Sequence, residues 1–108
     1  METNVQVKSY FFGNERGRIF ISITFEYKGF TQAFGPYQLE NYDADNDEFY
    51  AHPKSLEFIQ KILDAFGVSE LNRIVGKFAR IKIEDGLITK ITHIVEDEYY
   101  VDPLEIFN

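Results

Sequence analysis

The sequence contains no cysteine and no tryptophan, and none of its apolar runs is long enough to cross a membrane. Without cysteine, the chain can form neither disulfides nor thiolate metal sites, which suits a reducing compartment. A membrane-spanning helix needs about 20 consecutive apolar residues, and the N-terminus does not resemble a signal peptide. We therefore expect a soluble protein of the cytoplasm, stabilised by burial of apolar side chains.

The chain is also poor in basic residues. It has 11 Lys and Arg against 18 Asp and Glu, which gives a formal net charge of −7. Nucleic acids and anionic membranes attract basic surfaces, so this charge disfavours direct binding to either. Other proteins remain as partners.

Aromatic residues, by contrast, are abundant, with 11 Phe and 7 Tyr among 108 residues. A chain of this length fits one domain, residues 1–108, that can bury a core without disulfides or metals. One small core is not expected to hold all of these rings. The surplus suggests a contact surface.

The first third of the sequence predicts three strands. Val5–Phe12 has apolar residues on both sides, so its pattern does not decide which side is buried. Arg18–Tyr27 alternates apolar and polar residues along its length. Phe30–Leu39 returns as a strand that should bend, end or lie at a sheet edge at Gly35-Pro36, because proline donates no backbone hydrogen bond. The expected connections are a loop at Gly13–Gly17 and a turn at Lys28-Gly29.

The central segment predicts the main helix, because apolar residues recur there at helical spacing opposite a polar side. They are Leu56, Ile59, Leu63 and Phe66, with Phe58 and Ile62 widening the stripe. Pro53 suits the first helical turn, where its missing amide would be unpaired in any case. Gly67 suits the left-handed residue after the helix, with Val68 close to Leu63. Ser69 is expected to cap a short helical turn that runs through Ile74.

Residues 77–95 predict a β-hairpin. A two-residue turn at Asp85-Gly86 would place Lys90 opposite Ile81, on the apolar side. We favour a three-residue loop with a left-handed Gly86, because its register keeps the apolar residues together. That register pairs Ile83 with Leu87, Ile81 with Thr89 and Ala79 with Ile91, and it places His93 on the inner side, near Val95 and opposite Lys77.

Together these elements predict an α+β fold. We expect an antiparallel sheet of about five strands in the order β-β-β-α-β-β, because the connections within each group of strands are short. The helix would pack on one face, and the other face would meet solvent or a partner.

Two acidic segments contain aromatic residues but no Lys or Arg. The first, residues 40–52, is expected to be a loop or a poorly paired extended segment, and the second is the acidic tail, residues 96–108. We predict that they bind a partner through carboxylates that steer association and aromatic rings that become buried. The predicted partner-binding residues are Tyr42, Asp43, Asp45, Asp47, Glu48, Phe49, Tyr50, Glu96, Asp97, Glu98, Tyr99 and Tyr100.

The run Asp43–Glu48 begins like an EF-hand calcium loop. Such a loop requires Gly at its sixth position and Glu at its twelfth, but this sequence has Glu48 and Lys54 there. We therefore predict no metal site of this type; a weak cation site of another kind stays open. In an extended chain, Asp43, Asp45 and Asp47 would lie about 6.6 Å apart on one side, which approximates two base-pair steps and suggests phosphate mimicry.

No catalytic or cofactor-binding motif is present. There is no nucleophile elbow, P-loop, dinucleotide fingerprint or H-E-x-x-H sequence. His52, before a proline at the helix start, and His93, in the hairpin, are both interpreted as structural. Paired carboxylates for hydrolysis stay open, because sequence does not give their separation. We predict a non-enzymatic protein without a cofactor.

Arg80, Lys82 and Lys90 share the outer face of the hairpin and are interpreted as an ordinary solvated face beside Glu84. If this face binds an acidic group, the acidic tail of the same chain is the nearest candidate, which would form an intramolecular clamp.

Four segments resemble small uncharacterised proteins of bacteriophages and prophages. They are Lys28–Tyr37, Phe66-Gly67-Val68, Val75-Gly76-Lys77 and Arg80-Ile81-Lys82. The resemblance transfers no catalytic residue. It implies action in a bacterial cytoplasm by binding a host protein, such as a nuclease or another defence protein. The alternative is a self-associating homo-oligomer whose acidity serves only solubility.

Overall fold

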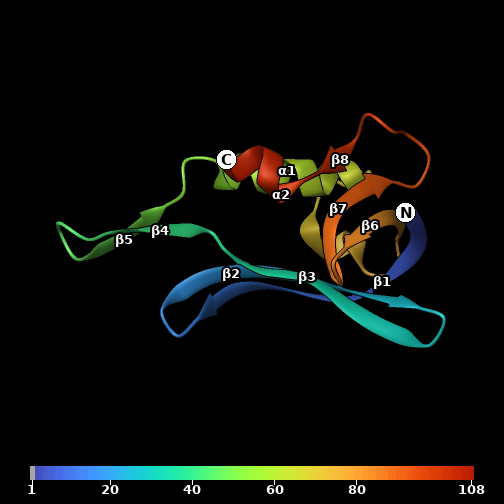
Figure 1. The fold of residues 1–108 in the computed structure, drawn as a ribbon, viewed down its shortest axis with the longest axis horizontal. Coiled ribbons are helices and arrows are strands. Elements are labelled where there is room, and N and C mark those ends of the chain that lie inside the picture. The colour runs from blue at the N-terminus through green and yellow to red at the C-terminus, as the bar shows by residue number, and fades with distance from the viewer. Residues whose placement is uncertain (1) are drawn as a thin grey trace.

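The computed structural model describes residues 2–108 and forms an α+β fold (Figure 1). The strands are β1 (Glu2–Glu15), β2 (Arg18–Tyr27), β3 (Phe30–Gln38), β4 (Glu40–Asp43), β5 (Glu48–Ala51), β6 (Phe78–Glu84), β7 (Leu87–His93) and β8 (Tyr100–Val101); the helices are α1 (Ser55–Phe66), the 3₁₀ turn η1 (Leu71–Ile74) and α2 (Pro103–Phe107). Six strands form one antiparallel sheet in the order β3-β2-β1-β6-β7-β8, and β4 and β5 pair separately. The antiparallel α+β class is confirmed. The prediction of five strands in β-β-β-α-β-β order is wrong, because the acidic hairpin and the tail add β4, β5 and β8.

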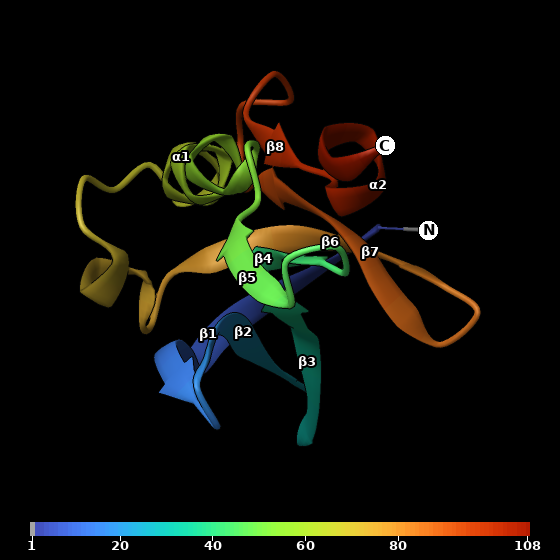
Figure 2. The same cartoon turned by 90° about the vertical axis from the view of Figure 1, so that its left-hand side faces the viewer.

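The helices α1 and α2 lie together on one side of the large sheet (Figure 2). Between them and the sheet lies a core of aliphatic and aromatic side chains. Phe66 of α1 stacks on Phe25 of β2 with ring centroids 6.2 Å apart, and Phe58 meets Phe34 of β3 at 6.1 Å. The main helix therefore packs on one face, as predicted.

The first strand is longer than predicted and continues through the expected loop to Glu15. A tight turn at Arg16-Gly17, both with positive φ, replaces the loop predicted at residues 13–17. The ladder to β2 shifts register between Val7 and Ser9. Such a bulge exchanges the faces of a strand, so Val7 is buried before it and Tyr10 packs against the core after it. This explains why both sides of the sequence are apolar.

The next two strands follow the sequence pattern closely. β2 has the predicted bounds, and Lys28-Gly29 forms the turn. β3 is an edge strand, and its pairing with β2 shifts register near Gly35-Pro36. The prediction of an edge or bend at the proline is confirmed.

Helix α1 forms where predicted, but its buried stripe is rotated. The buried residues are Phe58, Ile62, Ala65 and Phe66, whereas 81% of Leu56 is exposed. Pro53 lies in the turn before the helix rather than inside it, and Lys54 is the N-cap residue. At the other end Gly67 has φ 66°, and the Val68 amide donates to the Leu63 carbonyl at 3.1 Å, as predicted.

The segment after α1 corrects two predictions. Ser69 does not cap η1, because Glu70 occupies the N-cap position without a side-chain hydrogen bond. The β6–β7 turn has two residues, Asp85 and Gly86, both with positive φ, so the three-residue loop is wrong. A register shift between Lys82 and Ile83 then restores the apolar pairing.

The observed pairs are Ile83 with Ile88, Ile81 with Ile91 and Ala79 with His93. Paired residues share one side, so His93 does lie on the inner side, but opposite Ala79 rather than Lys77. Its expected neighbour Val95 is 73% exposed, which corrects the prediction that both lie inside.

The acidic tail is built into the fold. Val101 of β8 pairs with Ile91 and is buried, and Ile106 of α2 is also buried. Asp102 accepts hydrogen bonds from the amides of Leu104 and Glu105 and thereby caps α2.

Candidate partner-binding surface

The first acidic segment is a β-hairpin that projects from one end of the molecule (Figure 1). The prediction of a loop or poorly paired segment is wrong, because four residue pairs link β4 and β5 in register. Every residue of β5 is exposed. The hairpin therefore contributes little to the core, and its aromatic side chains remain available for contacts.

Three contacts hold the base of this hairpin to the body. The Glu40 carboxylate accepts a hydrogen bond from the Ile19 amide at 2.7 Å, and the Leu39 amide donates to the Ile19 carbonyl at 3.0 Å. Above them the Arg18 guanidinium lies 3.2 Å from the centre of the Phe49 ring. These contacts orient the hairpin relative to β2 and leave its end in solvent.

The two faces of the hairpin differ in composition. Paired residues lie on the same face, so Tyr42 and Phe49 share a face, and Asn41 and Tyr50 share the other. The Tyr42 and Phe49 rings are in contact, with centroids 4.9 Å apart. Tyr42 and Tyr50 are each about half exposed. Both faces thus offer an aromatic ring beside carboxylates.

The carboxylates at the hairpin end have distinct roles. Asp43 accepts hydrogen bonds from the Asp45 and Asn46 amides and from the Asn46 side chain. The Asn46 side chain is the main reason that the pKa of Asp43 is lowered, and both amides add to the effect. Asp47 accepts from the Tyr42 hydroxyl at 2.6 Å, which raises the pKa of Tyr42.

This geometry disagrees with phosphate mimicry by evenly spaced carboxylates of Asp43, Asp45 and Asp47. Asp43 ends β4, whereas residues 44–47 form a turn, and Asp47 has a positive φ. The regular spacing expected for an extended chain is therefore absent. Within residues 2–108, the side chains of Asp45 and Glu48 make no hydrogen bond or ion pair, so these two carboxylates are free to meet a partner.

The loop with Glu96, Asp97 and Glu98 lies at the opposite end of the molecule from the hairpin (Figure 1). The rest of the second acidic segment returns towards the hairpin base, where Phe107 of α2 packs against His52. Glu96, Asp97 and Glu98 belong to the loop between β7 and β8, and Tyr99 is 46% exposed there. Tyr100 is partly buried, and its hydroxyl donates to Glu105 at 2.7 Å, which is the main cause of its raised pKa. The structure therefore does not join the two predicted sets of binding residues, 42–50 and 96–100, into one surface.

The predicted clamp between the basic face and the tail is present at Arg80. Its guanidinium pairs with Asp97 and donates to the His93 carbonyl at 2.8 and 3.0 Å. Lys90 lies 4.5 Å from the centre of the Tyr100 ring. Lys82 instead pairs with Glu84 at 3.6 Å. The clamp holds the loop between β7 and β8 against the sheet.

Both histidines use Nδ1 as a hydrogen-bond acceptor. His52 accepts from the Lys54 amide at 2.9 Å and packs edge-on against Phe107. His93 accepts from the amides of Val95 and Glu96 at 3.1 and 3.0 Å. These bonds organise the start of α1 and the loop after β7. Within residues 2–108, no group of three or more His, Cys, Asp or Glu side chains is arranged to hold a metal ion.

Two apolar hollows were not expected from the sequence. One, of about 270 Å³, lies at the hairpin base between β1, β2 and α1; Phe12, Ile19, Ala51, Leu56 and Ile59 line it. The only available sequence signal was Leu56, because it lies at the edge of the helical stripe.

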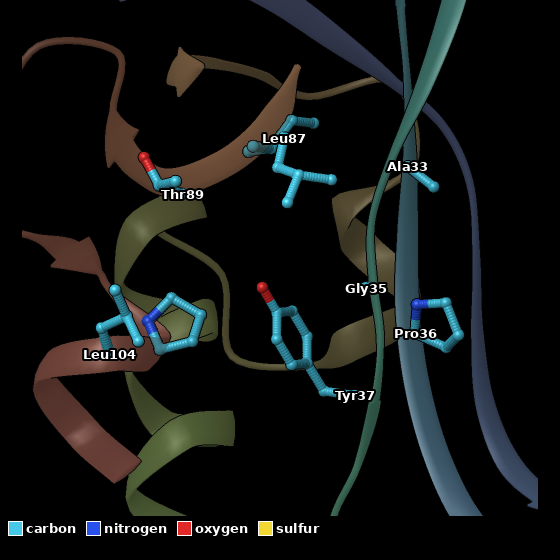
Figure 3. A pocket seen from close by; sticks show the side chains of 9 residues that line it. Ala33, Gly35, Pro36, Tyr37, Leu87, Thr89 and Leu104 are labelled. Atoms are coloured by element: carbon cyan, nitrogen blue, oxygen red, sulfur yellow. The ribbon is translucent and has the colours of Figure 1, made fainter. Parts of the chain in front are cut away.

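The other hollow, of about 360 Å³, lies between the edge of β3, the start of β7 and α2 (Figure 3). The Tyr37 side chain projects into it from β3, and Leu87 and Leu104 stand at its border. Burial, and then the charge of Asp102, raises the pKa of Tyr37. The Gln32 side chain donates to the Gly86 carbonyl at 2.7 Å and links β3 to the β6–β7 turn.

No protein-family model, curated protein or solved structure matches this chain. Among residues 2–108, no helix combines the length and apolar composition needed to cross a bilayer. The function is therefore inferred from the geometry of the site.

Proposed function

We propose that this chain is a non-enzymatic protein-binding module that contacts its partner through the β4–β5 hairpin. The observation that carries this proposal is the projection of a paired hairpin whose aromatic side chains, Tyr42, Phe49 and Tyr50, are 37–51% exposed. Exposed aromatic side chains are costly to solvate and are common in binding hot spots. The free carboxylates of Asp45 and Glu48 would steer a basic partner towards these rings.

A sharper version of the proposal follows from the sequence resemblance. The chain would act in a bacterial cytoplasm as a phage or prophage protein and would inhibit a host nuclease or another defence protein. Nucleic-acid-binding enzymes have basic surfaces, which the acidic hairpin complements. The resemblance supplies the biological setting, and the hairpin supplies the contact surface.

Affinity capture from nuclease-treated bacterial lysate tests the proposal. Asp45→Asn/Glu48→Gln removes the two free charges and leaves the Asp43 turn intact. Glu96→Gln/Glu98→Gln removes the same charge at the opposite end. One stoichiometric protein, recovered by the wild type and the second variant and lost with the first, is expected. Equal recovery by all three proteins would contradict binding through the hairpin charges.

The second candidate function is homo-oligomerisation through β3. The outer edge of this strand pairs with no other strand among residues 2–108, although Gln32 bonds to Gly86 across part of it, and Phe30 at its start is 73% exposed. A free edge can pair with a second copy. Light scattering over a range of concentrations distinguishes the candidates: a mass that rises with concentration supports self-association, and a constant monomer mass counts against it.

A further inference from the structure

We infer that the hairpin and the hollow at its base together bind one basic, amphipathic segment of a partner protein. This inference rests on the proposed function and specifies the chemistry of the partner. The observation behind it is that an apolar hollow and an acidic, aromatic hairpin adjoin and form one continuous surface.

The β4–β5 register shows this continuity. Tyr42 and Phe49 share a face with the preceding pair, Glu40 and Ala51, because alternate pairs in a ladder lie on the same side. Glu40 and Ala51 also line the hollow. The aromatic face of the hairpin therefore leads directly into the hollow, which Glu40 at the start of β4 and Ala51 at the end of β5 line.

Large apolar side chains flank the hollow without being buried. Leu56 is 81% exposed and Phe12 is 48% exposed; Ile19 and Ile59, which also line the hollow, are partly buried. An apolar side chain placed in the hollow would bury both exposed residues, which favours association. One or two apolar residues of the partner would suffice to fill about 270 Å³.

The charges of the hairpin and of the segments that form the hollow indicate the charge of the partner segment. The bordering segments, residues 12–19, 39–51 and 54–59, contain seven carboxylates: Glu15, Glu40, Asp43, Asp45, Asp47, Glu48 and Glu57. They contain three basic residues, Arg16, Arg18 and Lys54. The surplus of negative charge favours Lys and Arg on the partner. The Arg18 guanidinium already covers one face of the Phe49 ring, so the half-exposed Tyr42 ring on the same side of the hairpin is the one left for a cation of the partner.

A nuclear magnetic resonance titration with a synthetic helical peptide of leucine and lysine tests the inference. The amide signals of Phe12, Ala51, Leu56 and Ile59 are expected to shift together. Leu56→Lys should weaken the affinity about tenfold or more, because it removes an apolar contact and adds a like charge to the peptide. The matched control is Leu104→Lys, since Leu104 is 67% exposed at the other hollow, and its affinity should equal that of the wild type.

Several outcomes would overturn the inference. They are shifts centred on Leu87 and Leu104, equal losses in both variants, no binding, or equally tight binding of a lysine-only peptide of the same length. Signals that shift with protein concentration alone would assign the hollow to a second copy of this chain.

Binding of the two variants to the captured partner distinguishes a failure of this inference from a failure of the proposed function. If Asp45→Asn/Glu48→Gln loses the partner and Leu56→Lys retains it at wild-type affinity, the hairpin binds a partner and the hollow does not. If the peptide titration succeeds but no lysate protein depends on the hairpin charges, the hollow binds basic amphipathic segments and the proposed function fails.

Discussion

At the scale of single residues, Asp43 is both a predicted binding residue and a structural one. Its carboxylate accepts three hydrogen bonds from residues 45 and 46 and so orders the hairpin end. A folded-state pKa below the ordinary value means that Asp43 stabilises this turn above the ordinary aspartate pKa. That contribution is lost as the pH falls through the lowered value. Asp45 and Glu48 are therefore better probes of partner binding.

The first prediction concerns Asn46. Asn46→Ala removes the side-chain hydrogen bond that contributes most to the lowered pKa of Asp43, so this pKa should rise towards its ordinary value. Carbon-detected magnetic resonance of the carboxyl groups measures it. Asn41→Ala, on the same hairpin, serves as the control and should leave the titration of Asp43 unchanged. Identical titration of Asp43 in both variants and the wild type would contradict the assigned cause.

The second prediction concerns Tyr42 and Tyr100. The pKa of each is raised mainly by a hydrogen bond to a different carboxylate, Asp47 and Glu105 respectively. Asp47→Asn should lower the pKa of Tyr42 and leave that of Tyr100 unchanged, and Glu105→Gln should do the reverse. Both tyrosines favour the folded state below the ordinary tyrosine pKa, and this contribution disappears as the pH rises through the raised value. Alkaline titration of labelled tyrosine rings gives both values.

At the scale of elements, α1 shows why periodicity alone does not determine which face of a helix is buried. Residues 56, 59, 63 and 66 and residues 58, 62, 65 and 66 are both helical stripes. The second is buried because it faces the large sheet and α2: Phe66 stacks on Phe25 of β2, and Phe58 contacts Phe34 of β3 and Phe107 of α2. The apolar residue Leu56 is consequently left beside the hairpin.

This rotation leads to the third prediction. Ile62 is fully buried, so Ile62→Ala should reduce the free energy of unfolding by about 2–5 kcal/mol. Leu56→Ala should change it by no more than about 0.5 kcal/mol, because Leu56 is mostly exposed. Urea denaturation of the two variants measures both values. A larger loss for Leu56→Ala than for Ile62→Ala would show that Leu56, rather than Ile62, lies on the buried side of α1.

The β6–β7 hairpin shows a second limit at this scale. The sequence Asp85-Gly86 is typical of a two-residue turn, and that turn forms. The objection to it, a lysine on the apolar side, is removed by the register shift between Lys82 and Ile83. A bulge costs one unpaired residue, which is less than burying a charge. The apolar pattern was therefore a sound guide to which side is buried, and a poor guide to the register.

At the scale of the whole molecule, the projecting hairpin and the body are separable. The molecule measures 46 × 30 × 27 Å, and the hairpin forms one end of its longest axis (Figure 1). The core lies between the large sheet and the two helices and includes no residue of β4 or β5. Partner binding and stability should therefore be largely independent in this part of the chain.

The fourth prediction tests this independence. Replacing residues 42–49 with an Asn-Gly turn should change the free energy of unfolding by less than about 1 kcal/mol, because the removed residues are mainly exposed. Partner capture should be lost at the same time. Urea denaturation and the spectrum of the core amides measure the first effect. Unfolding of the shortened chain would show that the hairpin is part of the folding unit.

Sequence patterns alone were sufficient to predict the antiparallel α+β class, the bounds of β2, the position of α1 and its stop at Gly67, and an interruption of β3 at Gly35-Pro36. These features depend on local periodicity and on the special backbone geometry of glycine and proline. Both can be read from residues that are close together in the sequence. The acidic residues of the hairpin were also recognisable, because they form a continuous run without Lys or Arg.

Long-range contacts settle which helix stripe is buried, how bulges set the registers, and that the β4–β5 hairpin and the loop with Glu96, Asp97 and Glu98 lie at opposite ends. They alone bring Phe12, Ala51 and Leu56 around one hollow. These features depend on contacts between residues far apart in the chain, and the burial of one apolar side chain depends on what its neighbours leave uncovered. A local sequence pattern therefore does not show which of several apolar side chains will be buried.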